Sequence, residues 1–298
     1  MGYSEYSTHS YNTYRTSIAT KSFNEVFENQ EKRTISSEMS PVGLKIRESR
    51  DSDIHPNSIA VAIFMDGTGS MHHIPHAMVR DHLDTLMTTL INNGIPDPQI
   101  MFSVIGDYQY DHFPLQVGQF ESGDKELVKW LTQSYFEGGG GGDGSESYLL
   151  GWLVGARHTA LDCWEKRQKK GILFTIGDEM CHPEISAKAL NKIFGTNESV
   201  EVTAKELLDE ARKTWEVFHI HVNEGSYPDN TRVLDFWTDL LGMPPIVLHD
   251  QHKISEIIAT TVGLVHGVNI NSIVSAYDDT TKKNVTDTLN YVIQNYKV

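Results

Sequence analysis

The sequence predicts an α/β protein built on an open, mostly parallel sheet of the Rossmann-like type, with helices on both faces. Two observations predict this fold class. Short runs that are apolar on every side recur along the chain, as expected of parallel strands buried between two layers of helices. Between these runs, apolar residues return at intervals of three and four, which is the spacing of amphipathic helices.

The expected strands and helices alternate along the chain. Strands are expected at residues 59–65, 100–105, 172–176, 217–222 and 246–248. Helices are expected at residues 75–91, 148–166, 204–215, 231–241 and 253–266. Sheets of this kind hold their ligands at the carboxyl ends of the strands. Residues that directly follow a strand are therefore the candidates for a functional site.

Three regions are expected. Residues 1–57 are rich in Ser, Thr, Tyr and Glu and predict an N-terminal extension, partly flexible, with one short helix near residues 23–31. Residues 58–267 form the α/β domain. Residues 268–298 form a C-terminal amphipathic helical tail, with apolar side chains on one side of residues 281–296. Packing of this tail on the domain and binding of a partner both remain open.

Composition excludes several classes of protein. The formal net charge of −15 argues against a nucleic-acid-binding surface, because attraction to phosphates needs basic patches. No apolar run reaches the roughly 20 residues that cross a bilayer, and residues 1–15 lack the apolar stretch of a secretory signal. Cys163 and Cys181 form no Cys-x-x-Cys pair and are expected to be reduced thiols. These features predict a cytoplasmic protein without a membrane partner.

The first candidate motif is Asp66-Gly67-Thr68-Gly69-Ser70, directly after the first strand. One carboxylate and two hydroxyls stand at alternate positions, and the glycines allow a turn tight enough to bring them together. Oxygen donors without His or Cys suit a hard cation such as Mg²⁺ or Mn²⁺. Asp66, Thr68 and Ser70 are therefore predicted metal ligands, and a turn that only caps the next helix is the alternative.

Two further motifs stand at corresponding places. Residues 139–147 form a glycine-rich loop that contains no lysine, which disfavours a Walker-type phosphate site. We interpret this loop as a source of a metal ligand, either Ser145 or Asp143, with a plain surface loop as the alternative. Asp178 follows the strand at 172–176 and is the remaining predicted ligand. Agreement of three such motifs within one parallel sheet argues for a common site.

Together these motifs resemble the metal-ion-dependent adhesion site of von Willebrand factor A (vWA) domains. The resemblance lies in the D-x-T-x-S turn, the glycine-rich loop, and Asp178 with His182 four residues later. The usual first motif of the family is D-x-S-x-S, so Thr68 replaces its middle serine. The second motif of the family carries a threonine, and Ser145 stands in that place. The resemblance covers residues 45–267.

The flanks of the motifs resemble particular branches of that family. Residues 105–108 and 114–120 resemble bacterial and eukaryotic members, and residues 47–58 resemble the lead-in of bacterial and bacteriophage members. A phage-encoded chain would work in the host cytoplasm or in the virion.

The resemblance implies a protein-interaction module in which a bound Mg²⁺ or Mn²⁺ accepts an Asp or Glu carboxylate from a partner protein. Asp66 and Asp178 would balance the charge of the cation, and Asp143, Glu146 and Glu179 add negative charge nearby. His182 and Glu179 are expected to contact the ligands rather than the ion. We expect no catalytic residue, and therefore a scaffold or assembly protein rather than an enzyme.

Three other functions remain open at this point. The chain could be a regulatory partner of a MoxR-type AAA+ ATPase, since vWA proteins often work with such ATPases. It could be a structural component of a phage particle. A metal-dependent hydrolase that uses Cys181 and His182 is the third alternative. The sequence does not define the partner or the oligomeric state, and an oligomer is compatible with it.

Overall fold

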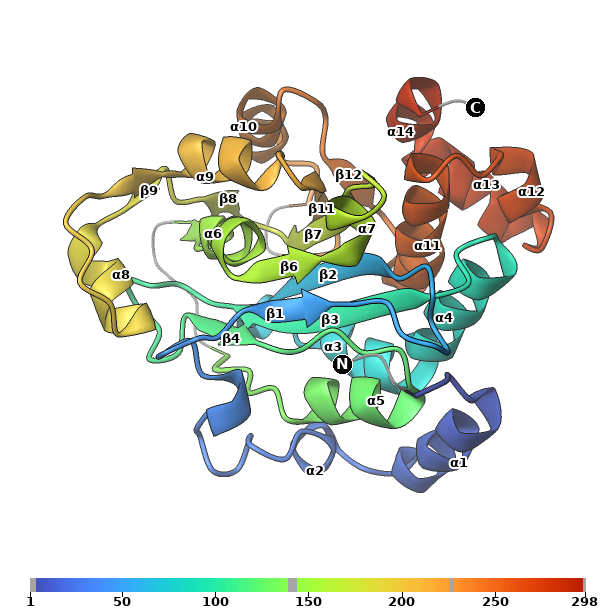
Figure 1. The fold of residues 1–298 in the computed structure, drawn as a ribbon, viewed down its shortest axis with the longest axis horizontal. Helices are drawn as coiled ribbons and strands as arrows, with labels where there is room; N and C mark the ends of the chain where they lie inside the picture. Colours follow the sequence, from blue (N-terminus) through green and yellow to red (C-terminus); the bar gives the residue numbers. More distant parts are fainter. Residues whose placement is uncertain (1–3, 139–143, 226–227, 297–298) are drawn as a thin grey trace.

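The computed structural model describes residues 4–138, 144–225 and 228–296, and its centre is a six-stranded sheet (Figure 1). The strands lie in the order β12-β11-β7-β2-β3-β4, and all neighbours are parallel except β3 and β4. The fold class predicted from the sequence is confirmed. The bounds are β2 (Ile59–Asp66), β3 (Pro98–Ile105), β4 (Leu115–Val117), β7 (Gly171–Gly177), β11 (Trp215–Val222) and β12 (Ile246–Leu248).

The five parallel strands are those that the apolar runs predicted, and the antiparallel edge strand β4 was missed. Its three residues include Gln116, which breaks any apolar run. The Gln116 side chain is buried, and it accepts a hydrogen bond from the backbone N–H of Tyr135 at 2.9 Å. A polar residue that finds its partner far along the chain leaves no local signal.

Short strands outside the main sheet tie loops together. The strands β1 (Arg47–Ser49) and β6 (Thr159–Leu161) pair in parallel, as do β5 (Ser145–Glu146) and β8 (Met180–Cys181). The strands β9 (Glu184–Ile185) and β10 (Val202–Thr203) pair antiparallel.

Helices cover both faces of the sheet (Figure 1). On one face lie α6 (Leu149–Arg157), α9 (Ala204–Ala211) and α10 (Thr231–Leu241). Here Trp237 of α10 stacks on His219 of β11, with ring centroids 3.5 Å apart. On the other face, α4 (Leu83–Asn92) packs against α11 (Ile254–Val265). Because both faces are covered, every residue of β2, β3 and β7 is buried.

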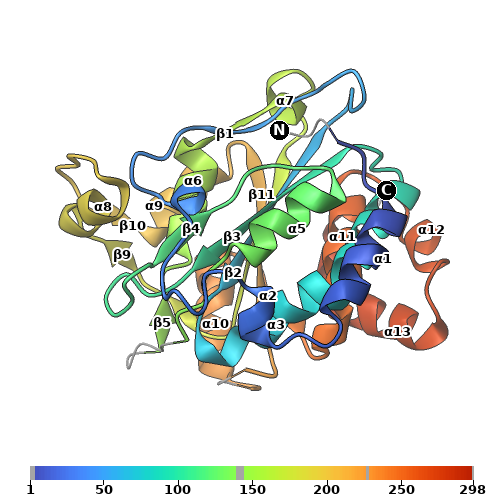
Figure 2. The same ribbon diagram turned by 90° about the horizontal axis from the view of Figure 1, so that it is seen from below.

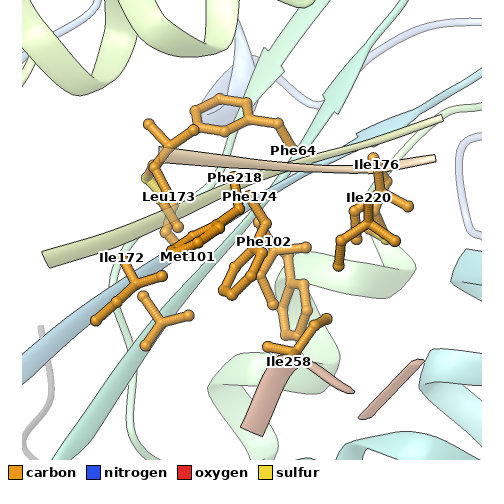
Figure 3. Close-up of a cluster of buried hydrophobic side chains, with 14 of the residues drawn as sticks. Phe64, Met101, Phe102, Ile172, Leu173, Phe174, Ile176, Phe218, Ile220 and Ile258 are labelled. Carbon is orange, nitrogen blue, oxygen red and sulfur yellow. The ribbon is translucent and has the colours of Figure 1, made fainter. Parts of the chain in front are cut away.

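The core is formed by branched and aromatic side chains of the central strands (Figure 3). Phe174 of β7 and Phe218 of β11 stack, with ring centroids 5.8 Å apart. In Figure 3, Phe64 of β2 and Ile258 of α11 lie on opposite sides of the strands. The sheet is thus held between two apolar layers, which fixes the positions of its strand ends.

Two predicted helices differ from the structure. Residues 75–91 form α3 (His73–Ala77), a π-helical segment η3 (Met78–His82) and then α4. Residues 148–166 form α6 and a short α7 (Asp162–Glu165), separated by β6. The break occurs because Thr159–Leu161 pairs with β1. The strand β1 lies far away in the sequence, and a local helical pattern gives no information about such a partner. The helices α5 (Asp124–Thr132) and α8 (Ala187–Phe194) were not predicted.

The N-terminal segment contains more helix than the sequence predicted. It contains α1 (Thr8–Ile18), α2 (Phe23–Val26) and η1 (Ser37–Met39), whereas only one short helix near residues 23–31 was expected. Tyr11 is 1% exposed and donates a hydrogen bond from its hydroxyl to the carbonyl of Val79 at 2.8 Å. Figure 2 shows α1 beside α5. Aromatic side chains without sustained helical spacing therefore bury this segment on the domain.

The same segment contacts the chain on either side of the predicted site. Phe23 stacks on His72, with ring centroids 5.0 Å apart, and Phe27 meets Phe136 edge to face. The backbone N–H of Phe136 donates to the Gln30 side chain at 3.0 Å. His72 follows the first predicted metal motif, and Phe136 precedes the glycine-rich loop. Residues 23–30 thus lie between the two.

The C-terminal segment packs on the domain. It contains α12 (Ile270–Val274), α13 (Asp279–Thr288) and α14 (Asn290–Asn295), so the amphipathic stretch predicted at 281–296 is two helices that meet at Leu289. Val285, Leu289 and Val292 are buried, as the apolar side of the pattern predicted. Tyr296 contacts Phe218 of the sheet, with ring centroids 6.1 Å apart.

Two smaller expectations concern the cysteines and the membrane. Cys163 and Cys181 are both buried and neither forms a disulfide. Within residues 4–138, 144–225 and 228–296, no helix combines the length and the apolar character that a membrane span requires.

Candidate metal centre

Asp66 and Asp178 lie at the same edge of the sheet, at the carboxyl ends of adjacent parallel strands. Asp66 is the last residue of β2, and Asp178 directly follows the last residue of β7. In the register of the two strands, Met65 is paired with Ile176, which brings the two aspartates next to each other. Asp66 is 1% exposed and Asp178 is fully buried. The pairing therefore brings two carboxylates together beneath the surface.

The carboxylate of Asp66 is fixed by two neutral donors. One oxygen accepts a hydrogen bond from the backbone N–H of Thr68 at 2.7 Å. The other accepts from the Tyr148 hydroxyl at 2.8 Å. The turn is anchored to β3 because the N–H of Gly67 donates to the carbonyl of Ile105 at 2.7 Å. A Cβ atom at Gly67 would lie 2.8 Å from Val104, so a larger residue does not fit there.

The hydroxyls of the first motif lie together beside this carboxylate. Thr68 Oγ1 and Ser70 Oγ are 3.4 Å apart, because the chain turns directly into the 3₁₀ helix η2 (Gly69–Met71). Thr68 is buried, whereas Ser70 is half-buried. The oxygen atoms of the motif thus extend from the buried Asp66 carboxylate to the half-buried Ser70 hydroxyl.

The second motif lies beside the third. Ser145 begins β5 and is paired with Met180 of β8, two residues after Asp178. The backbone N–H of Met180 also donates to the carbonyl of Gly144 at 3.2 Å. Ser145 is half-buried, as Ser70 is. Asp143, the other predicted ligand of this motif, lies outside the described residues.

The electrostatics of the two aspartates suit a cation. Burial, and then the nearby charge of Asp178, raise the pKa of Asp66, and the hydrogen bonds from Thr68 oppose this shift. Burial, and then the charge of Asp66, also raise the pKa of the Tyr148 hydroxyl, which therefore stays protonated and remains a donor. A positive charge between the carboxylates would remove the repulsion that raises the pKa of Asp66.

His182 and Glu179, which were expected to contact the metal ligands, contact different parts of the structure. Nε2 of His182 lies 3.0 Å from Asp107 Oδ1, and its Nδ1 lies 3.3 Å from the Gln109 amide nitrogen. The ring nitrogens of His182 therefore contact Asp107 and Gln109, neither of which was a predicted ligand. The carbonyl of Glu179 accepts a hydrogen bond from the Trp237 indole at 3.0 Å, which ties the loop after β7 to α10.

Cys181 and His182, which the hydrolase alternative used, are both buried. Cys181 is 1% exposed and His182 is 3% exposed. Burial also raises the pKa of the Cys181 thiol, so that it is neutral at physiological pH.

The structure adds three residues that the sequence analysis did not select as metal ligands or as contacts of the ligands, although Glu146 was expected to add negative charge nearby. Tyr148 binds Asp66 from the start of α6, and it was taken only as a helix residue. Asp107 stands two residues after β3, near the same edge of the sheet where Asp66 ends β2 and Asp178 follows β7. Its place at the end of an apolar run was visible in the sequence. Glu146 is fully buried. Burial, and then the charges of Asp66 and Asp107, raise the pKa of Glu146.

Gly225, in the loop after β11, comes close to Asp178. A Cβ atom at this position would overlap the Asp178 carboxylate, so that only glycine allows the backbone to pass there. No sequence signal marks this contact, since a single glycine after a strand is common in turns.

The donor set fits a hard cation. The oxygens of Asp66, Thr68, Ser70, Ser145 and Asp178 come from three loops at one edge of the sheet. Two carboxylates match the charge of Mg²⁺ or Mn²⁺, and neutral hydroxyls are oxygen ligands that such ions accept. In the described part of the chain, no three His, Cys, Asp or Glu side chains are grouped so as to hold an ion. The candidate set is therefore a mixed one of carboxylates and hydroxyls.

Comparison with known proteins gives structural matches only. No family model and no curated protein matches the sequence. Solved structures that match include the pilus adhesin SpaC from Lactobacillus rhamnosus GG in its open conformation (TM-score 0.43, 9% identity, 80% of this chain and 31% of the adhesin). A second crystal form of SpaC gives a TM-score of 0.44 at 10% identity, over 80% of this chain and 32% of the adhesin. The chain thus spans about a third of the length of that adhesin.

The VWA domain of SpRpn10 is also among the matches (TM-score 0.36, 12% identity, 61% of this chain and 82% of that domain).

Proposed function

We propose that the chain is a non-catalytic interaction module that binds one divalent cation, Mg²⁺ or Mn²⁺, at the carboxyl ends of β2 and β7. Asp66, Thr68, Ser70, Ser145 and Asp178 would hold the ion. A carboxylate from an Asp or Glu of a partner protein would complete the coordination, so that recognition depends on the metal. A scaffold or assembly role suits a module of this kind.

The observation that carries the proposal is the pair of buried carboxylates. Two ionised aspartates held side by side beneath the surface repel each other, and burial of such charges is costly unless they are paired or coordinate a metal. Both oxygens of Asp66 already accept hydrogen bonds from neutral donors, and these do not cancel its charge. A divalent cation supplies the charge that this pair lacks.

The arrangement of exposure supports access by a partner. Asp66 and Asp178 are buried, whereas Ser70 and Ser145 are half-buried and come from different loops. The solvent side of the site is therefore the side of the two serines. This is the side from which a partner carboxylate would approach an ion, and Mg²⁺ is a cation that exchanges part of its water for such ligands.

The test is Mg²⁺ binding by calorimetry, followed by partner capture in Mg²⁺ and in EDTA. The wild-type chain is expected to bind one Mg²⁺, and Asp66→Ala to lose this binding, because one of two charge-balancing ligands is removed. Asp209→Ala is the matched control, since Asp209 is exposed on α9 and pairs with Lys205 one turn before it. Capture of partners should need Mg²⁺ and should fail with Asp66→Ala.

Equal Mg²⁺ binding by the wild type and Asp66→Ala would contradict the proposed site. Partner capture that persists in EDTA would contradict the proposed dependence on the metal.

A further inference from the structure

Two buried carboxylates beside the proposed metal ligands have oxygen atoms that no described residue satisfies. Glu146 is fully buried, and among the described residues neither of its carboxylate oxygens has a hydrogen-bond partner. Asp107 is also fully buried, and its Oδ2 atom has none. A buried acceptor left without a donor destabilises the fold, and more so when it is charged. These three atoms therefore require an explanation.

Their position places them next to the metal ligands. Asp107 follows β3, Asp66 ends β2 and Asp178 follows β7, and these three strands are consecutive in the sheet. Glu146 follows Ser145, a predicted ligand, within β5. Of the charges that act on Glu146, that of Asp66 is the strongest, followed by that of Asp107. The unsatisfied oxygens thus belong to two residues close to Asp66.

Asp107 is oriented by its neighbours so that one oxygen is left over. Its Oδ1 atom contacts Nε2 of His182 at 3.0 Å and accepts the backbone N–H of Gln109 at 2.7 Å. The backbone N–H of Asp107 in turn donates to Asp111 at 2.7 Å. These contacts fix the carboxylate through Oδ1, while Oδ2 stays available as an acceptor.

Hydrated Mg²⁺ supplies the kind of donor that these atoms lack. Magnesium gives up its water reluctantly and usually keeps several water molecules when it binds to a protein. Each of these waters carries hydrogen atoms that need acceptors, and ionised carboxylates are acceptors only. A shell of buried carboxylate oxygens around the ligands would therefore satisfy the hydration waters and be satisfied by them.

We propose that Glu146, together with Asp107, accepts hydrogen bonds from the hydration shell of the cation and so positions a partly hydrated Mg²⁺ between the strand ends. This inference rests on the proposed function, because it needs a cation at Asp66 and Asp178. Glu146 and Asp107 are positioning residues here, and they act on the ion through water rather than as ligands.

The test compares Glu146→Gln, Glu146→Asp and the wild type in Mg²⁺ calorimetry. Gln keeps the shape of the side chain but lacks the charge, and we expect its Mg²⁺ affinity to fall about 10-fold or more, as for other residues that orient a metal site from outside. Asp keeps the charge, and Glu146→Asp should therefore lose less Mg²⁺ affinity than Glu146→Gln. The control is Glu256→Gln, another buried glutamate, which lies on α11 and pairs with Lys253. Its affinity should equal that of the wild type.

Melting curves in EDTA establish that each variant is folded before its affinity is compared, and Glu146→Asp serves if Glu146→Gln does not fold. Wild-type affinity in a folded Glu146→Gln, or an equal loss in Glu256→Gln, would overturn the inference. The proposed function fails differently, since it fails when Asp66→Ala binds Mg²⁺ as tightly as the wild type. Loss with Asp66→Ala but none with Glu146→Gln therefore rejects the positioning role alone.

Discussion

At the scale of single residues, the site depends on how neutral donors orient charged acceptors. Tyr148 shows this, because its buried hydroxyl donates to Asp66 and cannot ionise under ordinary conditions. The hydroxyl therefore fixes the direction of the carboxylate without changing the charge of the site. A basic residue in its place would have neutralised Asp66 and competed with a cation.

His266 gives a prediction about pH. This half-buried residue follows α11, and burial, together with the charge of Lys169, lowers its pKa to about 4. The unfolded chain takes up this proton near pH 6.5, whereas the folded chain does not. The stability that the folded protein gains by keeping His266 neutral is therefore fully present above pH 6.5. It is lost as the pH falls toward 4, because only the unfolded chain takes up the proton in this range. The expected loss from this residue is roughly 2 kcal/mol.

Urea unfolding at pH 7 and pH 4.5 measures this loss. In His266→Gln the difference in unfolding free energy between the two pH values should shrink by that amount. His9→Gln is the control, because His9 is exposed on α1. An unchanged pH dependence in His266→Gln would show that His266 takes up its proton equally in both states.

At the scale of elements, the packing of α6 on the sheet gives a prediction about glycine. Gly155 lies where a Cβ atom would be 2.6 Å from Leu173 of β7 and 3.3 Å from the indole of Trp215. Alanine is favoured over glycine in a helix by about 1 kcal/mol. Overpacking a rigid core costs about 1–3 kcal/mol. Because Leu173 and Trp215 are fully buried, the clash should exceed the helix gain, and Gly155→Ala should destabilise the fold.

Chemical denaturation of Gly155→Ala and Gly151→Ala measures this balance. The nearest atom to a Cβ at Gly151 is 3.0 Å away, on Phe64, so this matched substitution should cost less. A more stable Gly155→Ala would mean that α6 shifts outward without penalty.

The elements also show which parts of the fold were predictable. Strands such as Ile59–Asp66 were located because a strand that is buried on both faces consists of an unbroken run of apolar residues. The helix expected over 148–166 was wrong beyond Arg157, because Thr159–Leu161 is a strand only in the presence of β1. Partners that lie far apart in sequence leave no periodic signal, so pairings of this kind were missed.

At the scale of the whole molecule, the N-terminal segment gives a prediction about stability. Tyr11 is 1% exposed and binds the carbonyl of Val79. Tyr11→Ala should lower the free energy of unfolding by about 3 kcal/mol, as for other large buried side chains. Thr13→Ala, on the exposed side of α1, should have little effect.

Thermal and urea unfolding of both variants checks this expectation. Equal stability of Tyr11→Ala and the wild type would indicate that α1 does not contribute to the folded domain, in line with the flexible extension that the sequence predicted.

The candidate site was predictable to the extent that its residues follow strands. Asp66, Thr68, Ser70 and Asp178 were found because the end of each apolar run is visible in the sequence. Asp107 stands in an equivalent place but lacks a neighbouring hydroxyl motif, and it was passed over. Glu146 and Gly225 acquire their roles only through the approach of loops in space, which a linear pattern does not encode.

The separation of Asp66 and Asp178 along the chain also bears on how the protein folds. Their strands meet only after the segments containing β3, α5 and α6 have been accommodated. Contacts that close such long loops form late and slowly. An ion that needs both aspartates has no assembled site in the unfolded chain, and by mass action it would shift the equilibrium toward the completed sheet.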